Sequence, residues 1–336
     1  MKRMDLVIAG FGTVGQGFAE VLDMRGKSIA LSTGVEPRIV GAFDSKSAIY
    51  DEEGLDPNLL LYNKASGKVG NEPLVDGVAF LESIDYDLLV EVSPTNIVTG
   101  GPGLHHMRSA LGSGKHLITV NKGPLALAFS ELSSIARENC VEMRYEGSVG
   151  GGMPIINLCR ESLSGQEISS VMGILNGTCN FILSRMDSGL PFEQALKEAQ
   201  ELGYAESDPS YDIDGIDTAC KVVILANSVF EIDCNIHDVD VSGITAITEE
   251  AVAMAAEQNY CIRLIGEVSK ERLEVSPRLV LKGHPLSVGG TLNVAQVNTD
   301  LAGPISISGR GAGRLETASA ILSDLLAIIR SSVNNK

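Results

Sequence analysis

The sequence predicts an α/β fold built on a doubly wound parallel sheet, followed by a second domain of α+β type. Short apolar segments have the length of buried strands at residues 6–9, 38–44, 87–92 and 116–120. Helical patterns lie between them, one running to Leu22 and another at about 104–113. Strands that alternate with helices at this spacing are typical of a parallel sheet covered on both faces.

The alternation ends after about residue 135, which predicts a domain boundary there. Further strands are expected at 140–145, 167–175, 262–268, 276–282, 291–298 and 303–308. Further helices are expected at about 178–187, 191–201, 214–230 and 248–258. We therefore expect a first domain over 1–135, a second over 136–308, and a last helix, 309–330, that packs back on the first domain.

Composition excludes several classes of protein. The 336 residues carry a net charge of -17, which argues against a nucleic-acid partner because phosphate binding needs clustered Lys and Arg. No apolar run approaches the roughly 20 residues of a membrane span. The 6 cysteines form no CxxC pair and no cluster with histidine, so we expect reduced thiols in a cytoplasmic protein and no thiolate metal site.

The stretch GFGTVG directly follows the first strand and opens a helix. It fits the G-x-G-x-x-G pattern of dinucleotide-binding turns. The first glycine allows the tight turn, the second lets a pyrophosphate approach the backbone, and the third permits close packing of helix on strand. An ordinary strand-to-helix turn is the alternative. The predicted nucleotide contacts are Gly10, Phe11, Gly12, Thr13, Val14 and Gly15.

Asp44 ends the second strand, where an acidic residue would hydrogen-bond the adenosine ribose and favour NAD. It lies 29 residues after Gly15, later than the usual spacing of about 20, and a polar insert at 25–37 can account for the difference. Ser45 and Lys46 could instead hold a 2′-phosphate, so NADP stays open. A plain turn residue is an equally good interpretation of Asp44.

Two more loops follow strands at the carboxyl edge of the predicted sheet, where ligands sit in such folds. Ser93 and Thr95 follow the strand at 87–92, and Lys122 follows the strand at 116–120. A lysine there can reach both a nicotinamide and a substrate oxygen. From position alone, a surface lysine is the better interpretation.

The stretch GYAESDPSYDIDGIDTACK holds five carboxylates before its single lysine, Lys221. Asp214 and Gly215 resemble the start of a helix. Asp217 and Lys221 are then four residues apart on one helical face. A surface ion pair is one interpretation. Because the following residues are apolar around the whole turn, the alternative is a buried lysine whose pairing with Asp217 competes with burial, so that it can exchange a proton.

Several segments together resemble the homoserine dehydrogenase family: YEGSVGGGMPII, GILNGTCNFIL, ITVNKGPLA, the acidic stretch and the terminal GAG turn. They occur in the family's order and span nearly the whole chain. The resemblance implies a Rossmann-type nucleotide domain and a catalytic and dimerisation domain. It also implies reversible, NAD(P)H-dependent reduction of L-aspartate 4-semialdehyde to L-homoserine, on the route to threonine, methionine and isoleucine, by a homodimer.

Site residues follow from the resemblance by matching position. Lys221 is similar to the catalytic acid/base, and Lys122 to its partner near the nicotinamide. The implied substrate-binding residues are Glu206, Asp217, Asp212, Gly177 and Thr178. The implied cofactor contacts include the GFGTVG residues with Asp44, Ser45, Lys46, Ser93, Thr95, Lys122, Gly311, Gly313 and Thr317.

A monovalent-cation site (Na+ or K+) is also implied by the resemblance. Its ligands would be Glu146 and the backbone oxygens of Val149, Gly151 and Met153. Relatives often carry alanine where Gly151 stands, a change that a backbone ligand tolerates. Many also carry a C-terminal ACT domain or a fused aspartate kinase; this chain shows neither, so we expect no feedback regulation by an appended domain.

Two other functions compete with this interpretation. Aspartate-semialdehyde dehydrogenase shares the metabolite, but it needs a nucleophilic cysteine near a histidine, and none of the cysteines occupies an obvious site of that kind. A nucleotide-binding sensor without catalysis would bind NAD(P) and show no homoserine-dependent hydride transfer.

Overall fold

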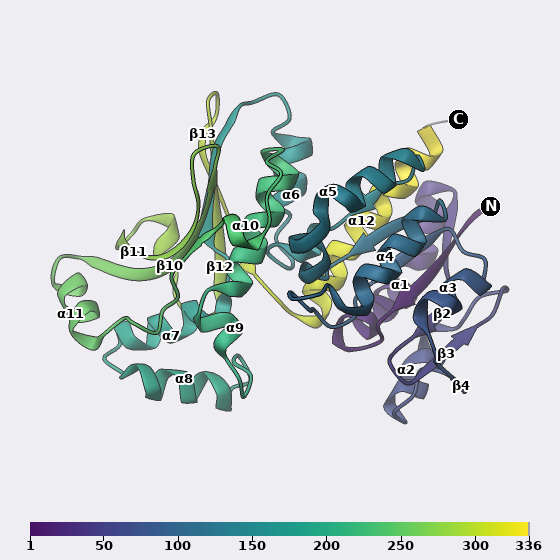
Figure 1. Ribbon diagram of the computed structural model, residues 1–336, viewed down its shortest axis with the longest axis horizontal. Coiled ribbons are helices and arrows are strands. Elements are labelled where there is room, and N and C mark those ends of the chain that lie inside the picture. The colour runs from purple at the N-terminus through teal and green to yellow at the C-terminus, as the bar shows by residue number, and fades with distance from the viewer. Residues whose placement is uncertain (335–336) are drawn as a thin grey trace. The chain divides into compact units, whose positions relative to one another are not determined.

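The computed structural model describes residues 1–334, which divide into two compact units. The first comprises Met1–Gly152 and the chain from Gly313 onward, and the second comprises Met153–Ala312. Each unit has its own sheet (Figure 1). Within residues 1–334, no helix is both long and apolar enough to cross a membrane.

The first unit is a mixed sheet with helices on it. Its strands are β1 (Lys2–Ala9), β2 (Val35–Phe43), β3 (Ser47–Tyr50), β4 (Glu72–Pro73), β5 (Leu88–Glu91), β6 (His116–Thr119) and β7 (Met143–Arg144). Its helices are α1 (Thr13–Thr33), α2 (Pro57–Ala65), α3 (Gly77–Ser83), α4 (Gly101–Gly112), α5 (Lys122–Glu138), the 3-10 helix η1 (Glu146–Ser148) and α12 (Arg314–Asn334).

The strand order is β4-β3-β2-β1-β5-β6-β7. Five neighbouring strands, β2, β1, β5, β6 and β7, pair in parallel, which confirms the predicted doubly wound sheet. The sequence did not predict the antiparallel edge formed by β3 and β4, whose strands are only 4 and 2 residues long. Helix α1 also continues to Thr33, well past Leu22, which explains why Asp44 follows Gly15 so late.

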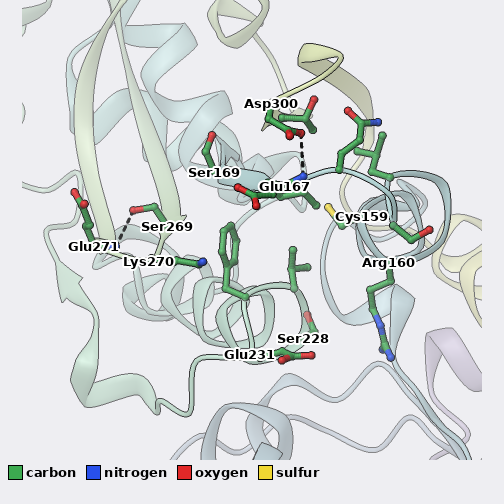
Figure 2. Close-up of a pocket in the computed structure, with 17 residues that line it drawn as sticks. Cys159, Arg160, Glu167, Ser169, Ser228, Glu231, Ser269, Lys270, Glu271 and Asp300 are labelled. Carbon is green, nitrogen blue, oxygen red and sulfur yellow. Dashed lines mark hydrogen bonds between the residues drawn. The ribbon is translucent and has the colours of Figure 1, made fainter.

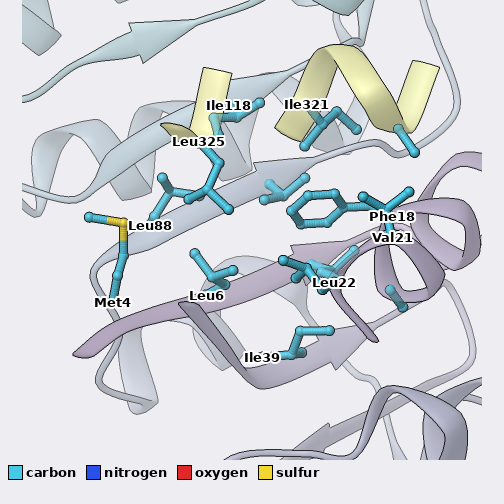
Figure 3. Packing of buried hydrophobic residues seen from close by; sticks show 14 of the residues in the cluster. Met4, Leu6, Phe18, Val21, Leu22, Ile39, Leu88, Ile118, Ile321 and Leu325 are labelled. Atoms are coloured by element: carbon cyan, nitrogen blue, oxygen red, sulfur yellow. The ribbon is translucent and has the colours of Figure 1, made fainter. Parts of the chain in front are cut away.

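The hydrophobic core of this unit contains residues from both the first and the last elements of the chain. Leu6 of β1 and Phe18 of α1 are fully buried together with Ile321 and Leu325 of α12 (Figure 3). Burying an apolar side chain of this size stabilises the fold by about 1.5–3 kcal/mol. The last helix therefore belongs to the first unit, although it begins at Arg314 rather than at residue 309.

The second unit is an α+β arrangement. Its strands are β8 (Ile168–Ile174), β9 (Asp240–Val241), β10 (Tyr260–Ser269), β11 (Leu273–Leu281), β12 (Leu292–Thr299) and β13 (Gly303–Arg310), in the order β13-β12-β8-β10-β11-β9. Its helices are α6 (Ile155–Asn157), η2 (Leu158–Ser162), α7 (Gly177–Asp187), α8 (Phe192–Glu201), α9 (Ser210–Ile213), α10 (Ile216–Val229), η3 (Ile236–Asp238), α11 (Glu249–Glu257) and η4 (Pro285–Ser287).

Helix α10 packs directly on this sheet. A side chain at Gly266 of β10 would lie 2.9 Å from Thr218 and 3.1 Å from Val222, so the glycine permits the close approach. Every residue from Asp217 to Asn227 is buried, which confirms the expected buried helix. The predicted cap was wrong: Asp214 follows α9 as its C-terminal cap, and Gly215 precedes α10 with a φ of 85°, a left-handed turn that separates two helices.

Candidate functional site

The turn between β1 and α1 has the shape that a pyrophosphate needs. Gly10 has a φ of 97°, and a side chain on it would lie 2.6 Å from the Ser93 nitrogen. A side chain at Gly15 would lie 2.2 Å from the Gly10 oxygen, whereas one at Gly12 would meet nothing within 4 Å. Open space at the second glycine, next to uncapped N–H groups at the start of α1, fits a phosphate bound at a helix N-terminus.

Asp44 lies at the end of β2, where the sequence places it, but its carboxylate already has partners. Oδ1 accepts hydrogen bonds from the Lys46 and Ser47 nitrogens at 2.8 and 3.0 Å, and Oδ2 pairs with Lys64 Nζ of α2 at 2.5 Å. Burial alone would raise the pKa of Asp44, but the Lys64 hydrogen bond and the backbone donors bring it below its usual value. Sequence reasoning missed Lys64, because it lies 20 residues further on.

A buried carboxylate organises the opposite half of the same sheet edge. Glu91, fully buried at the end of β5, accepts hydrogen bonds from the Ser93 nitrogen at 2.8 Å, the Ser93 hydroxyl, and Asn121 Nδ2 at 3.5 Å. It also pairs with His106 Nδ1 of α4 at 2.8 Å. These contacts tie the loop that carries exposed Thr95 to Asn121, the residue before Lys122. The signal in the sequence was Glu91, the acid that interrupts the apolar part of the strand DLLVEV.

The predicted contacts near the chain's end are divided between the units. Gly311 belongs to the second unit, where a side chain on it would lie 1.9 Å from Asn293 Nδ2. Gly313 and Thr317 belong to the first, and the Thr317 nitrogen donates to the Gly313 oxygen at 3.0 Å at the start of α12.

Lys221 and Asp217 form a buried ion pair within α10. Lys221 Nζ lies 2.7 Å from Asp217 Oδ2 and 2.5 Å from the Leu175 oxygen, and the two side chains are only 8% and 7% exposed. Charges are rarely buried without such partners, because desolvation costs several kcal/mol for each ion. The interpretation as a surface ion pair is therefore wrong.

Two further residues complete this cluster. Asn176 Nδ2 donates to Asp217 Oδ2 at 2.9 Å and to Asp212 Oδ1 at 2.6 Å. Burial, together with the Asp217 carboxylate, raises the pKa of Asp212 above its usual value. The structure thus brings Asp212, Asp217 and Lys221 together, and adds Asn176, which sequence reasoning missed.

The remaining predicted substrate residues lie around this cluster. Gly177 is the first residue of α7, and a side chain on it would lie 2.8 Å from the Thr291 oxygen. The Thr178 hydroxyl donates to the Tyr204 oxygen at 2.8 Å. Glu206 is exposed on the loop before α9, with its backbone oxygen 3.1 Å from Gln200 Nε2.

The predicted cation loop is tightly folded. Glu146 is 2% exposed, and its nitrogen donates to Asp324 Oδ2 of α12 at 2.9 Å. Gly151 has a φ of 58°, and Val149 is fully buried. Met153 begins the second unit. Among residues 1–334, no group of three or more His, Cys, Asp and Glu side chains is arranged to hold a metal ion.

A pocket of about 970 Å³ lies elsewhere in the second unit, at the C-terminal end of α10 (Figure 2). Its lining includes the charged residues Glu231, Glu271, Lys270, Arg160 and Asp300. None of the predicted site residues lines it. The residues that we expect to carry the chemistry therefore lie away from this pocket.

Comparison with protein families identifies both units. A model described as "Homoserine dehydrogenase, NAD binding domain" matches residues 10–146, and one described as "Homoserine dehydrogenase" matches residues 154–326. The homoserine dehydrogenase of Methanocaldococcus jannaschii is 48% identical over 98% of this chain and 99% of its own. The NAD(+)-dependent homoserine dehydrogenase of Pseudomonas canavaninivorans is 38% identical over 100% and 99%.

Solved structures agree with these matches. A putative homoserine dehydrogenase from Archaeoglobus fulgidus superposes with a TM-score of 0.90 at 48% identity, over 97% of this chain and 99% of that one. A hyperthermophilic archaeal homoserine dehydrogenase mutant in complex with NADPH gives a TM-score of 0.87 at 30% identity, over 98% of each chain.

Proposed function

The chain belongs to the homoserine dehydrogenase family, and from that premise we propose that Lys221 is the acid/base of its reaction. The reaction is the NAD(P)-dependent interconversion of L-homoserine and L-aspartate 4-semialdehyde. The observation that carries the proposal is the buried contact of Lys221 with Asp217 and the Leu175 oxygen. The rival sensor and aspartate-semialdehyde dehydrogenase functions lack this support from the relatives.

The geometry gives Lys221 a defined way to move a proton. An ammonium group has three N–H donors, and Asp217 and the Leu175 carbonyl accept two of them. In the direction of reduction, the third is donated to the substrate alkoxide as the aldehyde becomes an alcohol. In the direction of oxidation, neutral Lys221 takes the hydroxyl proton. Lys122 is proposed as a second cation that stabilises the negative charge developing on that oxygen.

The nicotinamide cofactor, when bound, gives or takes the hydride. We propose that the GFGTVG turn, Ser93, Thr95, Gly311, Gly313 and Thr317 contact it. The open space at Gly12 and the close backbone packing at Gly10 and Gly15 support this assignment. Glu91 would not contact the cofactor itself but would hold Ser93 and Asn121 in place through hydrogen bonds.

Asp44 and Lys64 are proposed to set the choice between NAD and NADP, with Ser45 and Lys46 beside them. A 2′-phosphate is an anion, so a free Lys64 would favour it and the Asp44 carboxylate would oppose it. Asp44→Asn is therefore expected to raise the ratio of kcat/KM for NADP over NAD by about tenfold. Glu52→Gln, at an exposed acid of the same unit, should leave the ratio unchanged. An unchanged ratio in Asp44→Asn removes Asp44 from this role.

Glu206 is proposed to bind the ammonium group of the substrate. Replacing it with Gln should raise the KM for homoserine by about tenfold and change kcat little, because the lost interaction is made equally in the ground and transition states. Asp208→Asn, two residues away and also exposed, serves as the control. An equal KM in wild type and Glu206→Gln contradicts the assignment.

A homodimer formed through the second unit is also proposed. The register places Glu267, Met172, Gln296 and Ser306 in one row across β10, β8, β12 and β13, on the face opposite to Gly266 and α10. All four side chains are partly or fully exposed. A second copy that covers this face would bury them. Sedimentation equilibrium should give twice the chain mass of 35.5 kDa; the mass of a single chain contradicts the proposal.

A monovalent cation held by Glu146 and the oxygens of Val149, Gly151 and Met153 is proposed as well. Gly151 supports it because its φ of 58°, which glycine adopts without strain, folds this loop tightly. Turnover measured in potassium or sodium chloride should exceed turnover in choline chloride at equal ionic strength. Equal rates in all three salts contradict the site.

We place this enzyme in the cytoplasm, in the synthesis of threonine, methionine and isoleucine. Each of the cysteines in the described chain is a free thiol, as a reducing compartment requires.

A further inference from the structure

Asn176 is the residue before α7, and its side chain caps that helix. Its Oδ1 accepts a hydrogen bond from the Cys179 nitrogen at 2.8 Å, and the residue is 5% exposed. Because an oxygen must face the backbone N–H, the Nδ2 group must point to the other side of the amide. The cap therefore fixes the orientation of the whole side chain.

On that other side, Nδ2 meets two carboxylates that come from different helices. One N–H is directed to Asp212 Oδ1 of α9 at 2.6 Å, and the other to Asp217 Oδ2 of α10 at 2.9 Å. The same Asp217 oxygen receives Lys221 at 2.7 Å. Asn176 and Lys221 thus share one acceptor atom.

Two carboxylates held this close repel each other, and a neutral double donor between them reduces that cost. Without it, Asp217 could rotate away from Asp212 and leave its position opposite Lys221. The ionisable groups facing the amide are Asp212, Asp217, Lys221 and Cys179, with Asp214 nearby. Each of the four lies on a helix that packs around the start of α7 or α10.

We propose that Asn176 is a positioning residue, which holds Asp217 in the orientation that pairs it with Lys221 and so keeps the lysine aligned with the substrate oxygen. This inference rests on the proposed role of Lys221. It goes beyond that role because it explains how the acidic pair beside the lysine is kept in place.

Asn176→Ser separates capping from positioning. Serine caps helices about as well as asparagine, but its hydroxyl is too short to reach both carboxylates. We expect kcat for homoserine oxidation to fall by about 10- to 100-fold, because a hydrogen bond to a charged group is lost, with the Kd for NADP or NAD close to wild type. Asn180→Ser is the matched control. Asn180 is a buried asparagine of α7 whose Nδ2 donates to the Leu292 oxygen. The kcat of this variant should stay within about threefold of the wild-type value.

Asn176→Asp supplies a readout that a purely structural role would not change. Its carboxylate adds a third negative charge at neutral pH, and on protonation it regains one donor. Burial beside two carboxylates raises the pKa of this third acid, so the ratio of variant to wild-type kcat should rise as the pH falls from about 8 to about 5.5, whereas the ratio for Asn176→Ser stays flat.

Wild-type kcat in Asn176→Ser, or a flat ratio in Asn176→Asp, overturns the proposal. The role of Lys221 is judged separately. If Lys221→Ala keeps its activity, the proposed function itself fails; if it loses activity while Asn176→Ser does not, only the present inference fails.

Discussion

Lys221→Ala is expected to lower kcat for homoserine oxidation by about 10²- to 10⁴-fold, the usual contribution of a positioned acid/base. The loss should appear in both directions of the reaction, because the same amine gives and takes the proton. Affinity for NADP and NAD should be unchanged, since the hydrogen bonds of Lys221 go to Asp217 and the Leu175 oxygen, neither of which is a proposed nucleotide contact. Steady-state assays and fluorescence titration of the reduced cofactor measure the two quantities.

Lys197→Ala is the control for loss of a lysine from the same unit. Its side chain is 76% exposed and lies 3.8 Å from Glu201, so its removal should leave kcat unchanged. A kcat near the wild-type value in Lys221→Ala, with homoserine saturating, contradicts the assignment of the acid/base.

Asp217→Ala is expected to lower the free energy of unfolding by about 3–5 kcal/mol, because it leaves the Lys221 ammonium buried without its carboxylate. Urea unfolding with linear extrapolation measures the change. Activity should fall as well, since the lysine is no longer held in place. Adding Lys221→Met to the same variant should restore much of the stability, because the unpaired charge is gone and the volume is similar.

The exposed pair of Lys197 and Glu201 again supplies the comparison. It has the same i to i+4 spacing as Lys221 and Asp217, reversed in direction, but lies at the surface. Glu201→Ala should change stability by no more than about 0.5 kcal/mol. If Asp217→Ala and Glu201→Ala lower the free energy of unfolding by the same amount, the burial of the Lys221–Asp217 pair does not make Asp217 important for stability.

Residue patterns over short stretches of the sequence predicted the nucleotide turn, the parallel strands and the buried helix α10. The GFGTVG turn, the parallel strands and buried α10 could all be expected from residue spacing and apolar runs. The start of α10 was misplaced because Asp214 and Gly215 together also fit a helix end followed by a left-handed turn. The edge strands β3 and β4 are too short to produce a pattern.

Contacts made over long distances in the chain could not be predicted in this way. Asn176 lies 36 residues from Asp212 and 41 from Asp217, and no spacing rule links an amide to carboxylates so far along the chain. Lys64 reaches Asp44 only because the chain after β2 returns through α2. The pairing of Lys221 with Asp217 was visible because both lie on one helix, and the apolar residues that follow indicated its burial.

Whether Lys221 moves the proton during hydride transfer is tested most directly by the first turnover, because product release can limit the steady state. Wild type and Lys221→Ala, each saturated with NADP or NAD, would be mixed rapidly with L-homoserine while the absorbance of the reduced nicotinamide is recorded. We expect a first turnover at least about 100-fold slower in the variant, with cofactor affinity retained. Equal first-turnover rates in the two proteins would contradict it.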